Sequence, residues 1–116
     1  MSLEFTILCT RPPTSFLEQR HAQLRWDADT DSGTFEGLRL DQRPLRPTDP
    51  LPEPGWASRV VSVIHASGHL SEDGFEDFDI WSYKLAQAVQ GAIYNQMMGI
   101  FTHAWSDSAE KLTSDG

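Results

Sequence analysis

The sequence is poor in cysteine, in cationic side chains and in long apolar runs. Cys9 is the only cysteine, which excludes a disulfide within the chain and a metal site built from several thiolates. Nine Lys and Arg residues stand against seventeen Asp and Glu residues, for a formal charge of −8. This balance argues against nucleic acids and anionic membranes as partners, because both are usually recognised by a basic surface. No apolar run approaches the roughly 20 residues that a membrane-spanning helix needs.

The chain shows no composition break that would mark a second domain. Its 116 residues suit one domain, and 39% of them are hydrophobic, which is enough to build a core. We expect a single domain over residues 1–105 and a polar C-terminal tail over 106–116. The first four residues, Met1 to Glu4, lack the positively charged region of a secretory signal, so a cytoplasmic location is expected.

The first elements predicted are a strand and a short helix. Residues 3–9 alternate with a period of two, which indicates an amphipathic strand. Ser15 and Glu18 have the spacing of a capping box, which predicts a helical turn beginning there. We favour a short helix followed by a strand over 21–26. A single longer helix over 15–25 is the alternative.

A hairpin and a proline-rich connection follow. The segment 27–33 is rich in Asp and Gly and predicts a turn between strands 21–26 and 34–40. Five prolines within residues 41–55 exclude a helix and a central strand, so this stretch is expected to be an extended surface connection inside the domain. The β-branched run over 59–66 is apolar on both faces, which is typical of a strand in the middle of a sheet.

The C-terminal part predicts one long helix and a second hairpin. Ser71 is a suitable N-cap for a helix over 72–90, with Gly91 as the C-terminal cap. Residues 92–95 and 100–105 then flank a short turn, although their apolar content would also suit a continuing helix. The whole order predicts a two-layer α+β domain: a mainly antiparallel sheet of five or six strands with both helices on one face.

Three aspartates with alternating spacing raise the question of a calcium site. Asp27, Asp29 and Asp31 resemble the start of an oxygen-rich loop, but the sixth and twelfth positions are Ser32 and Leu38, where an EF-hand needs Gly and Glu. The favoured interpretation is an acidic hairpin turn whose carboxylates accept hydrogen bonds from nearby backbone amides.

No catalytic motif is present. His65 and His103 lie in predicted strands, and a His–carboxylate pair there is the one arrangement with acid–base potential. Half-buried structural histidines are the favoured interpretation, and a zinc site at His65, His69 and His103 is disfavoured. Cys9 shares a strand face with Phe5 and Ile7, so we expect a small core side chain. The chain is therefore predicted to be a non-enzyme with no cofactor and no metal.

The start of the long helix is the most distinctive feature. It carries five acidic residues and no basic one, and the segment 71–116 has a formal charge of −6 against −2 for residues 1–70. The favourable interaction of acids with a helix N-terminus accounts for the first turn alone. A solvated face is one interpretation, and a docking surface for a basic protein is the other. The residues predicted to contact such a partner are Asp27, Asp29, Asp31, Trp56, Glu72, Asp73, Glu76, Asp77, Asp79 and Trp81.

A family resemblance accompanies this pattern. The central strand, the acidic helix ending in Leu-Ala-x-Ala-Val-x-Gly, the Ala-Ile-Tyr-Asn strand and the following Gly hairpin, all within residues 59–105, resemble small acidic bacterial immunity proteins. Asn95 and the pair Met97 and Met98 depart from that pattern. The resemblance implies an inhibitor that binds and occludes a cognate antibacterial toxin without catalysing a reaction.

Two other functions are compatible with the sequence. One is a small ligand-binding or enzymatic domain with a cleft between sheet and helix, lined by His65, His103, Tyr94 and Trp105. The other is a homodimeric adaptor joined through the terminal hairpin or a sheet edge.

Overall fold

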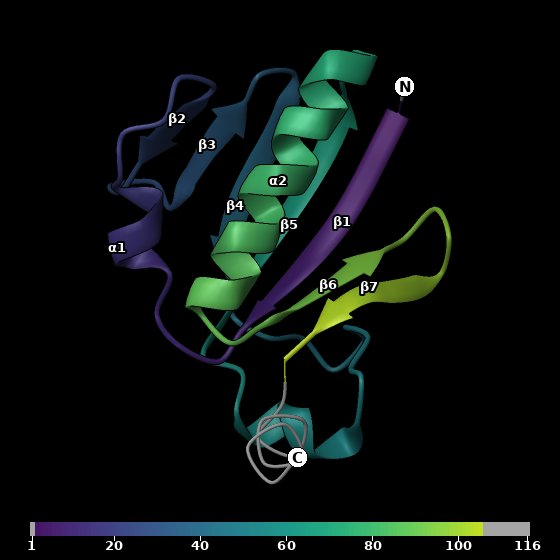
Figure 1. Cartoon of the computed structure of the whole chain (residues 1–116). Helices are drawn as coiled ribbons and strands as arrows, with labels where there is room; N and C mark the ends of the chain where they lie inside the picture. Colours follow the sequence, from purple (N-terminus) through teal and green to yellow (C-terminus); the bar gives the residue numbers. More distant parts are fainter. Residues whose placement is uncertain (1, 106–116) are drawn as a thin grey trace, which may run out of the picture.

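An antiparallel sheet of seven strands runs through residues 2–105, the part of the chain that the computed structural model describes. The strand order is β2-β3-β4-β5-β1-β6-β7, and α2 lies diagonally across one face of the sheet (Figure 1). The two-layer α+β architecture is therefore confirmed. The elements are β1 (Ser2–Cys9), α1 (Thr14–Leu17), β2 (Leu24–Asp27), β3 (Ser32–Phe35), β4 (Leu38–Arg43), the 3₁₀ helix η1 (Pro54–Ser58), β5 (Ser62–His69), α2 (Glu72–Ala88), β6 (Ala92–Asn95) and β7 (Ile100–Ala104).

The sheet has one strand more than the upper prediction because the segment 34–40 is two strands. Glu36 adopts a left-handed conformation with φ of 51° and forms a two-residue turn with Gly37 between β3 and β4. The backbone oxygen of His69 leaves no room for a Cβ at Gly37. The period-two alternation of residues 34–40 did not indicate this tight turn, which depends on the close approach of Gly37 to His69 of β5.

The predicted central strand has the correct place within the sheet, but its predicted residue range lies too early in the chain. β5 lies between β4 and β1, but it spans Ser62–His69 and not 59–66. The N–H groups of Arg59 and Val60 both donate to the carbonyl of Trp56, which extends the turn of η1 and delays the strand. The strand also continues past the predicted end at residue 66, through Ser67 and Gly68 to His69.

Helix α2 begins as predicted and ends two residues early. The Ser71 hydroxyl accepts a hydrogen bond from the N–H of Gly74 at 3.1 Å. At the other end the left-handed residue is Gln90, with φ of 50°, and the N–H of Gly91 donates to the carbonyl of Ala86 at 2.8 Å. Gly91 is therefore not the left-handed cap. It lies against the carbonyl of Leu8 in β1, where no Cβ would fit.

Helix α1 is a single turn, and the longer helix over 15–25 is wrong. Its N-cap is Pro13, and no side chain caps it, so the capping box at Ser15 does not form. The following strand, β2, begins at Leu24 and not at residue 21. The predicted hairpin turn after β2 and the predicted hairpin of β6 and β7 are both present.

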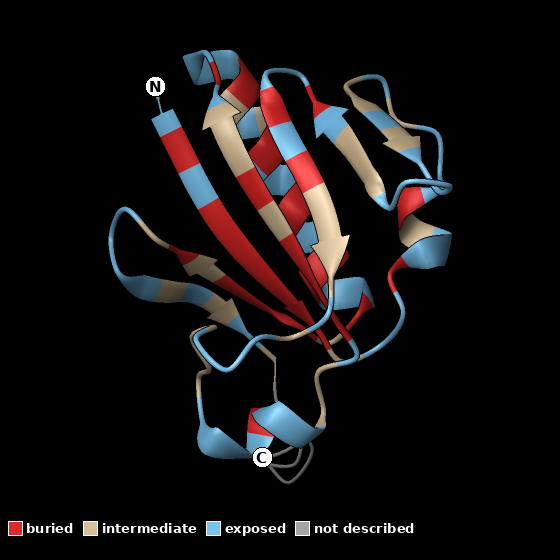
Figure 2. Ribbon diagram, turned by 180° about the vertical axis from the view of Figure 1, so that it is seen from behind, coloured by how far each residue is buried: buried red, intermediate tan, exposed pale blue. Residues whose placement is uncertain are grey.

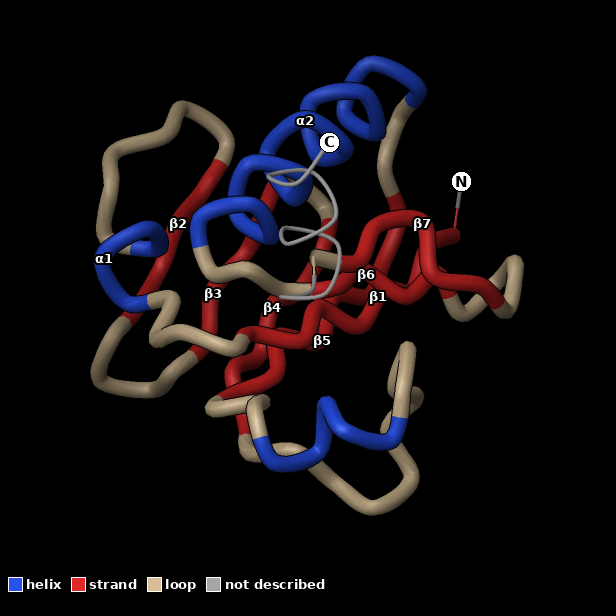
Figure 3. The backbone as a smooth tube through the Cα atoms, turned by 60° about the horizontal axis from the view of Figure 1, so that its bottom comes forward, coloured by secondary structure: helices blue, strands red, loops and turns tan. Residues whose placement is uncertain are grey.

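The sheet is packed on both faces. On the face that α2 covers, side chains of β1, β4 and β5 pack against Phe78, Trp81 and Leu85 of the helix. On the opposite face, called the far face below, a smaller core is formed by Leu8, Trp56, Val63 and Ala92. Figure 3 shows α2 and the η1 region on opposite sides of the sheet. As a result the lower half of β1 is buried on both faces (Figure 2).

The proline-rich segment does more than connect β4 to β5. Leu45 and Leu51 pack against the far-face core, to which η1 contributes Trp56. Within residues 2–105, no helix combines the length and the hydropathy needed to cross a membrane. The predicted tail, 106–116, lies outside the described residues.

Candidate functional site

The N-terminal part of α2 and the β3–β4 turn form a surface of carboxylates. The five acidic residues of α2 lie on the arc of the helix opposite Phe78 and Leu85, and Asp77 alone among them is half-buried. The carboxylate of Glu36 lies over Gly74, in the space that a Cβ would occupy. We call this surface the acidic corner; its members are Glu36, Glu72, Asp73, Glu76, Asp77 and Asp79.

The acidic corner contains little that would neutralise it. Asp77 accepts a hydrogen bond of 3.0 Å from the side-chain amide of Gln23. Among the residues that the structure describes, none of its carboxylates forms an ion pair. The ion pairs seen between described residues lie elsewhere, at Arg39–Asp41, Arg43–Asp49 and His65–Glu4. The charges of the acidic corner are consequently available to a cationic partner.

The second predicted acidic element does not join the acidic corner. Asp27, Asp29 and Asp31 lie in or beside the β2–β3 turn, at the opposite end of that hairpin from Glu36. The Asp27 carboxylate accepts the N–H of Asp29 at 2.9 Å, which is the turn-stabilising hydrogen bond expected of an acidic hairpin. Among residues 2–105 no group of three or more potential ligands is placed to hold a metal ion.

Both tryptophans predicted as contact residues are buried. Trp56 is 1% exposed and fills the far-face core, with Arg59 stacked over its ring at 5.1 Å. Trp81 is 3% exposed, and its ring lies 6.0 Å from that of Phe16 in α1. The prediction was wrong for these two residues because each is covered by a segment distant in sequence.

The two candidate catalytic histidines are not neighbours. His65 on β5 points to the far face, where its Nε2 lies 2.8 Å from the carboxylate of Glu4. His103 on β7 points to the α2 side and packs between Tyr83 and Trp105. Strands β1 and β6 separate β5 from β7. The predicted cleft lined by both His65 and His103 therefore does not form, and the carboxylate beside His65 comes from Glu4 of β1.

Cys9 is a core side chain, as expected. It is completely buried between the sheet and α2, and this burial raises the pKa of its thiol to about 12. A thiol in this state is neutral near pH 7 and is a poor nucleophile.

The terminal hairpin carries three exposed large apolar side chains. Met97, Met98 and Ile100 are 49%, 64% and 48% exposed, and β7 is an edge strand. A register shift opposite Ile93 and Tyr94 interrupts its pairing with β6. Bulges of this kind discourage further strand addition, so this edge is poorly suited to extending the sheet.

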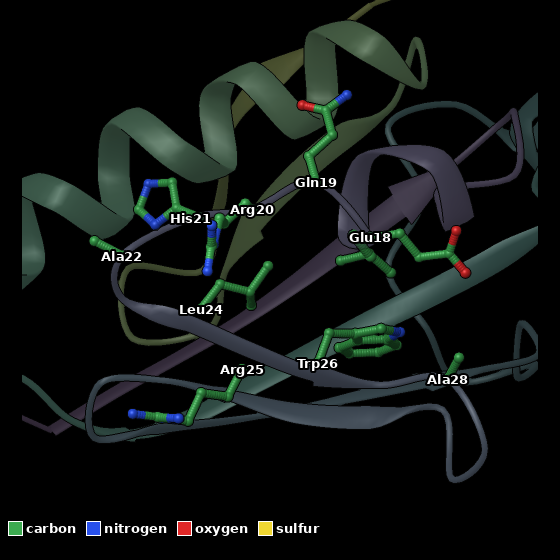
Figure 4. Close-up of a pocket in the computed structure, with 10 residues that line it drawn as sticks. Glu18, Gln19, Arg20, His21, Ala22, Leu24, Arg25, Trp26 and Ala28 are labelled. Carbon is green, nitrogen blue, oxygen red and sulfur yellow. The ribbon is translucent and has the colours of Figure 1, made fainter.

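A groove that the sequence did not indicate lies between the segment 18–22 and β2. Its volume is about 740 Å³, and its walls include Leu17, Arg20, Leu24 and Trp26 (Figure 4). Leu24 and Trp26 alternate with Arg25, which is the signal of a one-sided strand. The groove itself depends on how residues 18–22 pass beside that strand, and no local sequence pattern predicts the path of these residues.

Comparison with known proteins adds no assignment: no family model matches the chain, and neither a curated protein nor a solved structure is significantly similar to it.

Proposed function

We propose that the protein is a non-enzymatic binding protein that uses its acidic corner to hold the basic surface of a toxin domain and so neutralises it. The observation that carries this proposal is the concentration of exposed carboxylates at the start of α2, none of which forms an ion pair among the described residues. We also propose that the protein binds its partner in the cytoplasm.

Fold stability does not account for these charges. Glu72 and Asp73 lie in the first turn, where the helix dipole favours an anion by about 0.3–1 kcal/mol. Glu76 lies one turn further on, where this benefit has faded, and it is four residues from Glu72. Like charges at that spacing destabilise a helix by about 0.2–0.5 kcal/mol. Since the acids beyond the first turn cost helix stability, a binding role explains them better than a structural one.

The chemistry of the partner follows from the sign of the charge. A field of one sign accelerates encounter with a surface of the opposite sign and rejects partners of like charge. Toxin domains that attack nucleic acids carry basic surfaces for their substrates, and an acidic inhibitor can cover such a surface. The resemblance of residues 59–105 to immunity proteins supports the same class of partner.

A pair of matched variants tests the acidic corner. In the first, Glu72→Gln, Glu76→Gln and Asp79→Asn remove three exposed charges from α2; in the second, Asp27→Asn, Asp29→Asn and Asp31→Asn remove three exposed charges from the β2–β3 turn. Asp77 is left unchanged because it binds Gln23. Both variants change the net charge equally, so a difference between them reports position and not total charge.

The readout is capture of a partner from the source cells by the tagged protein, at low and moderate salt, followed by mass spectrometry. We expect wild type and the turn variant to retain one partner with a basic domain, and the α2 variant to lose it. Equal retention by both variants would remove the acidic corner from the interface. Co-expression tests neutralisation: the partner's domain should arrest bacterial growth alone and not in the presence of this protein.

A further inference from the structure

The groove between the segment 18–22 and β2 has the properties of a small-molecule site. Its volume, about 740 Å³, lies within the range of roughly 300–1,000 Å³ that is typical of ligand pockets. One wall is the chain that leaves α1, and the other is β2, as Figure 4 shows. No residue that lines the groove belongs to the acidic corner, so a ligand bound here would add a role to the proposed one.

The lower wall is apolar. Leu24 and Trp26 project from the same side of β2 into the groove, whereas Arg25 projects from the other side of the strand (Figure 4). Both are half-buried and pack against the core, to which the buried Leu17 of α1 also belongs. The Trp26 ring lies against Gly33 on β3, in space that a Cβ would fill. This contact holds the indole in one place as a flat surface for a ligand ring.

The opposite wall supplies a cation. Arg20 is exposed and extends from its segment toward Leu24 (Figure 4). Within residues 2–105 its guanidinium forms no ion pair, although the chain has nearly twice as many acidic as basic residues. Arg20 also lines a smaller hollow of about 190 Å³ together with Lys84 of α2. The carboxylate of Glu18 lies at the other end of the groove, beside α1 (Figure 4).

The backbone of β2 supplies a further donor. The N–H of Glu36 donates to the carbonyl of Gln23, which fixes the hydrogen-bonding pattern between β2 and β3. The backbone N–H and C=O groups of Gln23 and Arg25 therefore point toward β3, whereas those of Leu24 and Trp26 point to the open edge of β2. The N–H of Leu24 is used by the carbonyl of His21, which places the segment 18–22 on this outer side. The N–H of Trp26 points to the same open edge of β2.

We propose that this groove binds a small aromatic carboxylate, with its ring on Trp26 and Leu24 and its carboxylate on the guanidinium of Arg20. The apolar wall selects the ring, and the cation selects the anionic group. An extended peptide fits less well, because β2 has four residues and one of its two outward N–H groups is already bound within the chain.

Titration with 2-naphthoate tests the site, with 2-naphthylmethylamine as the cationic control ligand. We expect saturable binding of one naphthoate, with the largest amide chemical-shift changes at Ala22, Leu24 and Trp26. The amine should bind at least about tenfold more weakly, which corresponds to about 1.4 kcal/mol. The variant Arg20→Gln should raise the Kd for naphthoate about tenfold, and Arg11→Gln, an exposed arginine outside the groove, should leave it unchanged.

The proposal would be overturned by no saturable binding up to about 10 mM naphthoate, by equal affinity for the amine, or by shift changes confined to other surfaces. Shift changes on β2 with an acidic peptide but none with naphthoate would assign the groove to a peptide and also overturn it. None of these results bears on the acidic corner, whose variants leave the groove intact.

Discussion

Arg43 and Asp49 form a two-point ion pair in which both N–O distances are 2.8 Å. Arg43 is the last residue of β4, and Asp49 lies in the proline-rich segment, where it also accepts the N–H of Arg46 at 2.7 Å. Their side chains are 16% and 8% exposed. The pair fastens the proline-rich segment to the sheet next to the place where Leu45 and Leu51 join the far-face core.

Replacing Asp49 should destabilise the fold. Asp49→Asn leaves the half-buried guanidinium of Arg43 without a charged partner, and we expect the free energy of unfolding at pH 7 to fall by about 1–3 kcal/mol in urea denaturation. Asp41→Asn is the matched control, because the Arg39–Asp41 pair is exposed at 72% and 40% and should contribute little. Equal losses in the two variants would contradict the anchoring role of Asp49.

The same pair predicts a pH dependence with a definite sign. The hydrogen bond from Arg43 lowers the pKa of the Asp49 carboxyl below its ordinary value of 3.8. Since the folded pKa is the lower one, the stabilisation is complete above pH 3.8 and is lost as the pH falls through the folded pKa. The stability difference between wild type and Asp49→Asn should therefore be constant from neutral pH to the ordinary pKa and shrink below it, as followed by urea denaturation at successive pH values.

Two glycines should differ in how strongly replacement by alanine destabilises the fold. A Cβ at Gly91 would collide with the carbonyl of Leu8, so Gly91→Ala must displace the junction between α2 and β6 and should cost about 1–3 kcal/mol. A Cβ at Gly55 meets nothing within 4 Å, and Gly55→Ala should change stability by less than about 0.5 kcal/mol. Thermal unfolding of both variants measures the difference, and a neutral Gly91→Ala would disprove the close contact.

The C-terminus of α2 offers a stabilising substitution. Gln90 holds a left-handed conformation that glycine adopts without cost, so Gln90→Gly should stabilise the fold by about 0.5–1 kcal/mol. Gln87→Gly, within the same helix, should destabilise it by about 1 kcal/mol. Denaturant midpoints of the two variants should move in opposite directions; a shift in the same direction would mean that the left-handed conformation of Gln90 is not strained.

The thiol of Cys9 should be unreactive in the folded protein. Its pKa of about 12 and its complete burial leave almost no accessible thiolate at pH 8. We expect an aromatic disulfide reagent to react with the thiol in concentrated guanidinium chloride and to leave it unmodified in native buffer. Rapid modification of the native protein would place Cys9 outside the core.

Local patterns were sufficient for much of the architecture. The period-two alternation of residues 3–9, the Ser71 cap and the turn chemistry of 27–33 each describe contacts between residues close in sequence. Local features of this kind do not depend on where the segment packs in the fold. The strand, the helix start and the hairpin were therefore predictable from the sequence. The turn at Glu36 was not, because its left-handed residue is not glycine and the turn is held by distant contacts with β5 and α2.

The features of the candidate sites also fall into two groups, those set by local sequence and those set by tertiary packing. Sequence alone determined the charge of −8, its concentration at the start of α2 and the lack of a thiolate metal site, because these depend on residue types and on neighbours within one helix. Tertiary structure alone decided that Trp56 and Trp81 are buried, that His65 and His103 lie on opposite faces and that Arg20 overlooks a groove. The physical reason is that periodicity fixes the direction of a side chain relative to its own element, whereas burial and clefts depend on which remote segment packs there.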